Sequence, residues 1–286
     1  MSEQVQSVNQ LKQQQRIDWD AAASGWKQWW STFERAAQHV SDRLVELAAV
    51  RPGHRVADLA TGIGEPAISA ARRVGTAGIV VAIDQSPGML AVARERAAAV
   101  GLGNLEFRVG DIESLEADEH TFDAALCRWG LMFVPDLDAT ARGIRRALKP
   151  GARLATAVWS TPDKVPMISL GGEAVRSLAG LPPRQPGALD PFRLADVSIL
   201  TRALEGAGFS EVRSETLEVV FEFGSVDEFS RFRAGVSAPL RAVMERCTPD
   251  VREQILRATA EAAAPYRRAD GSLRLPNETI CVVARA

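Results

Sequence analysis

Apolar positions in the first half of the chain follow two alternating periods. Phe33, Val40, Leu44 and Leu47 recur with the spacing of a helix face, and from there to Trp159 short apolar runs alternate with helical patterns. The short runs are apolar at consecutive positions, as in parallel strands that are covered on both faces. The alternation predicts a doubly wound, mostly parallel α/β sheet with short loops.

The pattern after residue 160 predicts a further helix, two further strands and a helical insertion between those strands. A helix is expected over about 194–207, and strands over 211–223 and 277–284. Ser225-x-x-Glu228 is typical of a capping box and Thr248-Pro249-Asp250 of another helix start. The expected organisation is a helical arm or lid at 1–50, a core at 51–224 and 267–286, and a helical cap at 225–266.

The segment V-A-D-L-A-T-G-I-G-E-P-A, residues 56–67, joins an apolar strand to a glycine turn. Gly62 and Gly64 allow a tight turn beneath a ligand, and Pro66 suits the start of the next helix. The spacing also satisfies the G-x-G-x-x-G/A dinucleotide pattern, so the glycines alone do not identify the cofactor. Asp58 argues against a pyrophosphate, which its carboxylate would repel, and favours an ammonium or sulfonium ligand.

Two more acids follow the next two predicted strands. Asp84 comes 20 residues after Gly64, where an acid would bind both hydroxyls of a ribose, and Asp111 follows the strand F-R-V-G, where it could meet an exocyclic adenine amine. Ligands of such sheets bind at the carboxyl ends of the strands, so the acids are expected to converge. Each also has a structural alternative: Asp58 and Asp111 could cap helices, and Asp84 could be a turn acid.

Five segments together resemble the class I S-adenosylmethionine-dependent methyltransferases, in particular the small-molecule branch with the ubiquinone and menaquinone biosynthesis methyltransferases. They are D-L-A-T-G-I-G-E-P (58–66), V-V-A-I-D-Q-S-P-G-M-L (80–90), G-D-I-E (110–113), F-D-A-A-L-C-R-W-G-L (122–131) and L-K-P-G-A-R-L (148–154). The resemblance covers about residues 40–160. It implies a Rossmann-like sheet with an antiparallel final strand, and S-adenosyl-L-methionine as the cofactor.

Carried over by position, the resemblance implies a role for each segment in holding that cofactor. The residues around its methionine part would be Asp58, Ala60, Thr61, Gly62, Gly64 and Pro66. Asp84 would hold the ribose, Gln85 and Met89 would flank the adenine, and Gly110, Asp111 and Ile112 would meet the adenine edge. Cys127 and Arg128 would lie beneath the sulfonium, although a small polar residue or His is commoner than Arg at this place in the family.

Four of the six tryptophans lie within twelve residues of the N-terminal arm: Trp19, Trp26, Trp29 and Trp30. Helical spacing puts Trp19, Trp26 and Trp30 on one face, and for most of these rings simple docking on the core is the preferred interpretation. In similar methyltransferases an aromatic residue at the place of Trp26 covers the cofactor and excludes water. We therefore expect the arm to act as a lid.

The candidate acceptor-binding residues are Trp29, Trp30, Arg128, Trp129 and His39. Arg128 either forms an ion pair, with an acid such as Asp58 or a residue of the arm, or receives an anionic group of the substrate. His39 could reach the pocket mouth, but a solvated helix face is the simpler interpretation. No residue is assigned as a catalytic base.

Composition narrows the partners further. A net charge of −2 and a pI near 6.0 give no basic surface for nucleic acid, and the segment after the fourth strand lacks the Asn/Asp-Pro-Pro-aromatic sequence of nucleobase amino-group methylation. Three scattered cysteines indicate neither disulfides nor a metal cluster and fit a reducing compartment. With no apolar leader and no membrane-spanning run, a cytoplasmic location is expected.

The sequence thus predicts an S-adenosylmethionine-dependent methyltransferase that acts on carbon or oxygen of a small, largely apolar metabolite. Two alternatives stay open. An NAD(P)-dependent reductase would use the same glycines, but the chain has no Tyr-x-x-x-Lys. A non-catalytic S-adenosylmethionine-binding module would share every cofactor residue. The oligomeric state is not predicted.

Overall fold

The computed structural model describes residues 3–181 and 189–286, in which seven strands form one sheet in the order β3-β2-β1-β4-β5-β7-β6. The strands are β1 (Arg55–Leu59), β2 (Ile79–Asp84), β3 (Leu105–Val109), β4 (Phe122–Arg128), β5 (Leu148–Trp159), β6 (Ser210–Phe223) and β7 (Leu273–Arg285). β1 to β5 run parallel, and β7 is antiparallel to both of its neighbours. The predicted fold class is confirmed.

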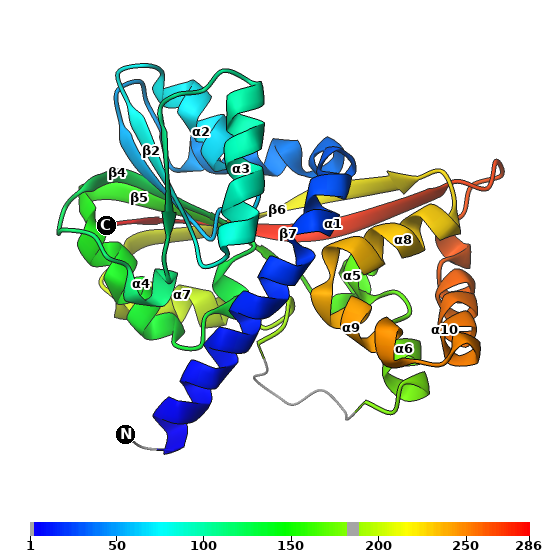
Figure 1. Cartoon of the computed structure of the whole chain (residues 1–286). Coiled ribbons are helices and arrows are strands. Elements are labelled where there is room, and N and C mark those ends of the chain that lie inside the picture. Colours follow the sequence, from blue (N-terminus) through cyan, green and yellow to red (C-terminus); the bar gives the residue numbers. More distant parts are fainter. Residues whose placement is uncertain (1–2, 182–188) are drawn as a thin grey trace.

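Helices cover both faces of this sheet (Figure 1). α2 (Ala67–Val74) and α3 (Pro87–Ala99) lie on one side, and α4 (Leu137–Ala147) and α7 (Val197–Gly206) lie on the other. The carboxyl ends of β1, β2, β3 and β4 therefore meet at a single edge, as the positions of the three acids require.

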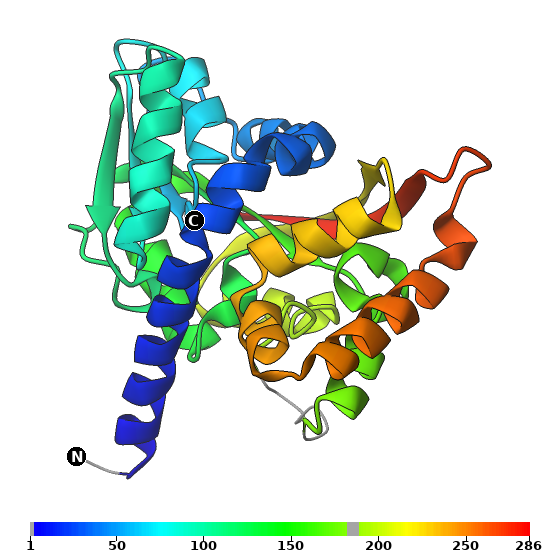
Figure 2. The same cartoon turned by 45° about the vertical axis from the view of Figure 1, so that its right-hand side comes forward.

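The final strand is longer than expected, since β7 begins at Leu273 rather than near residue 277. It pairs with β6 along its whole length, whereas its pairing with β5 starts only at Thr279. Pro276 thus lies where β7 has one neighbour only, a position at which a missing N–H is tolerated. β6 and β7 therefore form a long hairpin that extends past the rest of the sheet (Figure 2).

The N-terminal arm and the following helix are one element, α1 (Glu3–Leu47). The tryptophan segment and the Phe33–Leu47 stripe lie in this one helix, because residues 3–47 contain no proline that would end it. The first turns of α1 extend beyond the body of the molecule, and the later turns lie against the sheet (Figures 1 and 2).

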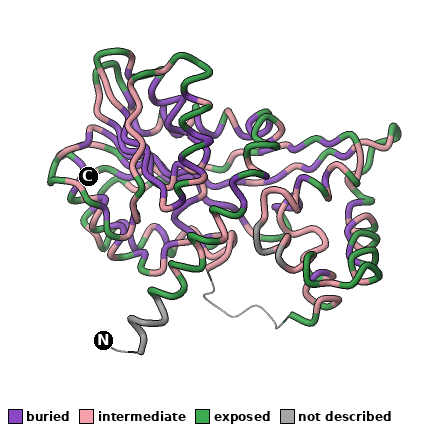
Figure 3. The backbone as a smooth tube through the Cα atoms, in the orientation of Figure 1, coloured by how far each residue is buried: buried purple, intermediate pink, exposed green. Residues whose placement is uncertain are grey.

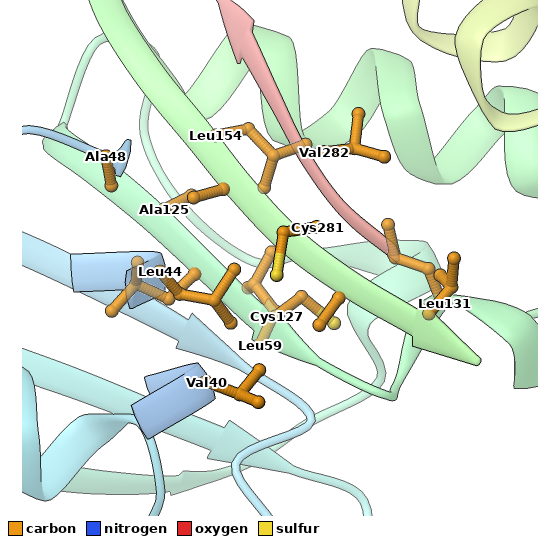
Figure 4. Packing of buried hydrophobic residues seen from close by; sticks show 14 of the residues in the cluster. Val40, Leu44, Ala48, Leu59, Ala125, Cys127, Leu131, Leu154, Cys281 and Val282 are labelled. Carbon is orange, nitrogen blue, oxygen red and sulfur yellow. The ribbon is translucent and has the colours of Figure 1, made fainter. Parts of the chain in front are cut away.

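The central strands and the inner face of α1 form the core (Figure 3). Val40, Leu44 and Ala48 pack against the sheet, and Cys127 and Cys281 lie among these apolar side chains (Figure 4). Both thiols are buried and unpaired. Within the described part of the chain, no helix has the length and apolar character needed to cross a membrane.

A helical cap packs beside the long hairpin (Figure 2). It contains α8 (Val226–Val236), α9 (Ala238–Arg246) and α10 (Pro249–Ala262) from the expected insertion, together with α5 (Pro166–Ser169) and α6 (Gly172–Leu178), which precede α7. Ser225 Oγ accepts a hydrogen bond from Glu228 N, and Glu228 Oε2 accepts one from Gly224 N. The capping sequence at Ser225 therefore starts α8 as predicted.

Candidate cofactor-binding site

The glycine turn between β1 and α2 leaves space on one side and packs tightly on the other. Gly62 has φ +55°, and a Cβ added there would meet no atom within 4 Å. Gly64 has φ +102°, and its added Cβ would lie 3.2 Å from both Ala93 Cβ and Ile68 Cδ1. Gly64 thus permits close packing on α3, whereas Gly62 keeps bare backbone beside an open space that a ligand can fill.

Asp58 is fully buried at the end of β1, and only one of its carboxylate oxygens has a partner. Oδ2 accepts hydrogen bonds from Thr61 Oγ1 at 2.5 Å and from Ala67 N, the first residue of α2, at 2.9 Å. Oδ1 has no hydrogen-bond partner. Burial raises the pKa of Asp58 to about 7. The helix-capping alternative accounts for Oδ2, while Oδ1 is an unused acceptor suited to a cationic donor.

Asp84 ties the ends of two strands together. Its Oδ2 accepts from Gly62 N at 2.8 Å and its Oδ1 from Ser86 N at 2.9 Å. The carboxylate is therefore a turn acid, as one interpretation held, and it also fixes the glycine turn. Burial raises its pKa to about 6.

Asp111 caps a short helical turn, because its Oδ1 accepts from Glu113 N at 2.9 Å. Its Oδ2 pairs with Lys12 Nζ of α1 at 2.8 Å, and Lys12 also contacts Glu113 at 2.5 Å. The flanking residue Ile112 is buried, and Gly110 N donates to the carbonyl of Asp84. The three acids expected to converge do stand at the ends of β1, β2 and β3.

The predicted ion pair of Arg128 is present, and its partner is Glu34 of α1. The two guanidinium Nη atoms donate to the Glu34 carboxylate at 2.6 and 2.8 Å, and Nη1 also donates to Ser41 Oγ at 2.8 Å. The guanidinium lies 5.7 Å from the Phe33 ring centroid and 5.0 Å from that of Trp129. Both members of the pair are buried. These contacts occupy the side chain that was also considered for an anionic substrate group.

α1 therefore contacts residues at the carboxyl ends of three strands, β2, β3 and β4. Lys12 reaches Asp111 after β3, Glu34 reaches Arg128 at the end of β4, and Asp20 accepts from Ser86 Oγ and Gly88 N after β2. The roles of Lys12, Asp20 and Glu34 were not predicted from the sequence. Their partners lie 66 to 99 positions away. No pattern among neighbouring residues predicts pairs that are so far apart along the chain.

The tryptophan face is partly different from the expected one. Trp26 packs 4.8 Å from Phe33, and its buried Nε1 has no hydrogen-bond partner. Trp29, rather than Trp30, joins it by packing on Phe232 of α8 at 5.8 Å. Trp30 is 41% exposed, with the Arg96 guanidinium 4.7 Å from its ring. α3 and α8 flank this part of α1 on different faces, since Trp30 contacts Arg96 of α3 and Trp29 contacts Phe232 of α8.

The remaining candidates lie in three different surroundings. Trp129 has φ +59°, stacks on Trp159 at 4.2 Å and donates from Nε1 to Thr279 Oγ1 at 2.9 Å. Met89 is buried against α1. Cys127 is buried in the core, and burial raises the pKa of its thiol to about 12, so the thiol stays protonated. His39 is exposed, with Nε2 2.9 Å from the carbonyl oxygen of Glu218.

A separate open groove of about 680 Å³ lies at the opposite edge of the sheet, where β1 and β4 begin. Arg55, Arg108, Phe122 and Arg146 line it with residues 113–118. It contains none of the predicted site residues. In the described residues, no group of three His, Cys, Asp or Glu side chains could hold a metal ion.

Comparison with known proteins identifies the part of the chain that carries this site. Residues 51–179 match the family model of a methyltransferase domain. This segment of the chain is therefore similar to methyltransferase domains. The chain is 39% identical over 119 residues to the ubiquinone/menaquinone biosynthesis C-methyltransferase UbiE of Cellvibrio japonicus, a match that covers 41% of this chain and 48% of the relative. The chain thus spans about half the length of the relatives it matches, and the resemblance stated from the sequence is confirmed.

Solved structures extend the likeness of fold beyond the domain. A putative methyltransferase of Haloferax volcanii, in complex with the activator Trm112, superposes with a TM-score of 0.56 at 20% identity and covers 95% of this chain and 96% of its own. The [4+2]-cyclase SpnF superposes with a TM-score of 0.52 at 24% identity, covering 88% and 82%. The same fold thus carries more than one chemistry, so the activity has to be argued from the site.

Proposed function

We propose that this protein is an S-adenosyl-L-methionine-dependent methyltransferase that methylates carbon or oxygen of a small, largely apolar acceptor. The observation that carries the proposal is the unpaired Oδ1 of buried Asp58, an acid four residues before Gly62, whose backbone has open space beside it. A buried carboxylate with a spare oxygen favours a cationic ligand and disfavours a pyrophosphate. The match of residues 51–179 to a methyltransferase domain supports the same cofactor.

Each candidate residue then has a definite task toward that cofactor. Asp58, Ala60, Thr61, Gly62, Gly64 and Pro66 would border its amino-acid end, Asp84 its ribose, and Gln85, Met89, Gly110, Asp111 and Ile112 its adenine. When bound, the cofactor supplies an electrophilic methyl group on a sulfonium. Cys127 and Arg128 would lie beneath that group, and the buried pair with Glu34 neutralises the Arg128 charge there.

The aromatic side chains would shape a dry acceptor site. Trp26, Trp29 and Trp129 gather with Phe33 and Phe232 where α1 passes between β4 and α8. Methyl transfer is an in-line displacement that benefits from fixed geometry and exclusion of water, and these rings supply both. Trp30 and His39 are not carried into this proposal, because both are exposed in the structure.

We assign no catalytic base in this region. Glu34 is held by Arg128, and the Cys127 thiol is protonated. The chemistry of the proposal is therefore positioning of an acceptor that is already nucleophilic.

The test is calorimetry with S-adenosylmethionine, S-adenosylhomocysteine and NADH, followed by turnover against a library of small apolar acceptors. We expect binding of the first two ligands, none of NADH, and release of S-adenosylhomocysteine with at least one acceptor. Binding of NADH alone would replace the proposal with the reductase alternative. Binding of S-adenosylmethionine without turnover of any acceptor would leave the non-catalytic module.

A further inference from the structure

α1 and α8 cross at two glycines with no space between their backbones. A Cβ added to Gly25 of α1 would lie 1.9 Å from the carbonyl oxygen of Gly235, and a Cβ added to Gly235 of α8 would lie 2.7 Å from Trp29 Cδ1. Real Cβ atoms do not approach other atoms so closely, so any side chain at Gly25 must move one helix away from the other. Gly25 itself is buried.

Further contacts fasten the cap to the same part of α1. Trp29 packs edge-on against Phe232 at 5.8 Å, and Phe33 stacks on Phe232 at 6.5 Å. Arg241 of α9 donates to the carbonyl of Ala21, within one helical turn of Gly25. Figures 1 and 2 both show α8 alongside α1 at this place.

The opposite side of α1 is fastened to the candidate cofactor site. Lys12 pairs with Asp111, and Asp20 accepts from Ser86 and Gly88 at the start of α3, next to Asp84. None of the candidate cofactor residues lies in α8. α1 is therefore one rigid element with the cofactor edge of the sheet on one side and the cap on the other.

We propose that Gly25 and Gly235 are positioning residues that couple cofactor binding to closure of the acceptor cap. The inference rests on the proposed function. A cofactor held between the strand ends and α1 favours the docked position of α1, and because the crossing has no clearance, α8 is held with it. Such coupling is reciprocal, so a bound cofactor raises the affinity for the acceptor by the factor by which the acceptor raises the affinity for the cofactor.

Hydrogen exchange of the full-length chain, with and without saturating S-adenosylhomocysteine, tests this coupling. In the unmodified protein we expect the ligand to slow exchange in residues 226–236, which it does not touch, by about fivefold or more, the lower end of measured couplings. In Gly25→Ala we expect the ligand to slow exchange around Asp84 and Asp111 but no longer in α8. The matched control is Gly143→Ala in α4, where an added Cβ meets nothing within 4 Å and the α8 response should persist.

Two results would overturn the inference: no ligand effect on α8 in the unmodified protein, or an undiminished effect in Gly25→Ala. If Gly25→Ala does not fold, Gly235→Ala makes the same test, because the clash there is with the movable Trp29 ring. Failure of S-adenosylhomocysteine to bind at all, seen by calorimetry, would instead refute the proposed function and this inference with it. Binding without an α8 response would refute the coupling alone.

Discussion

Replacing Asp84 by Asn separates the proposed cofactor role of this carboxylate from its structural role. Both oxygens already accept backbone N–H groups, from Gly62 at 2.8 Å and from Ser86 at 2.9 Å. Asp84→Ala would remove both bonds and loosen the glycine turn, so any loss of affinity would be ambiguous. Asn keeps the shape and one acceptor oxygen, and its amide removes the charge that a ribose hydroxyl would meet.

The size of the effect follows from what the carboxylate would do in the complex. A hydrogen bond to a charged group contributes about 1.5–3 kcal/mol, so its loss should raise Kd by about 10- to 150-fold. Stability should change less, because two opposing effects accompany the substitution. One backbone N–H loses its acceptor, because the amide nitrogen of Asn cannot accept a hydrogen bond, but the cost of ionising a buried acid whose pKa is raised to about 6 is relieved.

Calorimetry with S-adenosylhomocysteine at pH 8, where Asp84 is ionised, measures the affinity, and urea denaturation shows that the variant is folded. Asp123→Asn is the matched control, because Asp123 also accepts a backbone N–H, from Arg55 at 2.8 Å, but lies at the far edge where β4 begins. Its Kd should equal that of the unmodified protein. A folded Asp84→Asn variant with unchanged affinity would refute the ribose assignment.

Three further predictions concern the neighbouring residues. Gly62→Val should abolish detectable S-adenosylhomocysteine binding in calorimetry, because its side chain would enter the open space and oppose φ +55°, and normal binding would refute the cradle. Burial raises the pKa of Asp58 from 3.8 to about 7, so between these pH values the folded chain holds a proton that the unfolded chain has lost, and the unfolding free energy should fall as pH rises through this range. Urea denaturation at pH 5 and 8 should show a smaller fall in unfolding free energy for Asp58→Asn than for the unmodified protein. Equal falls would contradict the assignment. Glu34→Gln should destabilise the protein by about 3–5 kcal/mol in the same assay by leaving Arg128 buried without its partner. The exposed pair of Lys27 with Glu95 supplies the control, since Lys27→Gln should cost about 1 kcal/mol at most.

Local patterns predicted most of the sheet and the acids at its edge. Apolar runs and helical periods are properties of neighbouring residues, so the mostly parallel sheet and the carboxyl-end placement of Asp58, Asp84 and Asp111 followed from general rules of α/β folds. The structural alternatives for these acids turned out to describe real hydrogen bonds. Asp58 does cap α2, and Asp84 does hold a turn, yet Asp58 keeps one oxygen without a partner. Capping and ligand binding are therefore not exclusive explanations for a buried acid.

The parts that the sequence did not predict depend on partners that are distant along the chain. Glu34 and Arg128 are 94 residues apart, and Lys12 and Asp111 are 99 apart. The choice of Trp29 over Trp30 depends on where α8 packs, which no helical period contains. These contacts all belong to α1, the element that crosses from the cofactor edge to the cap.

Gly25 is a residue of α1 whose type indicates close contact with a distant part of the chain. A glycine within a helix lowers helix stability by about 1 kcal/mol relative to alanine, and Gly25 stands in the middle of a helix of 45 residues. Nothing in α1 itself explains that cost, since the backbone at Gly25 is helical and needs no positive φ. The explanation lies 210 residues further on, at Gly235 in the last turn of α8, where the two backbones meet. A glycine in a helix interior that faces the backbone of another helix is evidence that close approach of the two elements matters more than the stability of the helix itself. The crossing, rather than the more conspicuous tryptophans, is therefore the place to test how the cap responds to the cofactor.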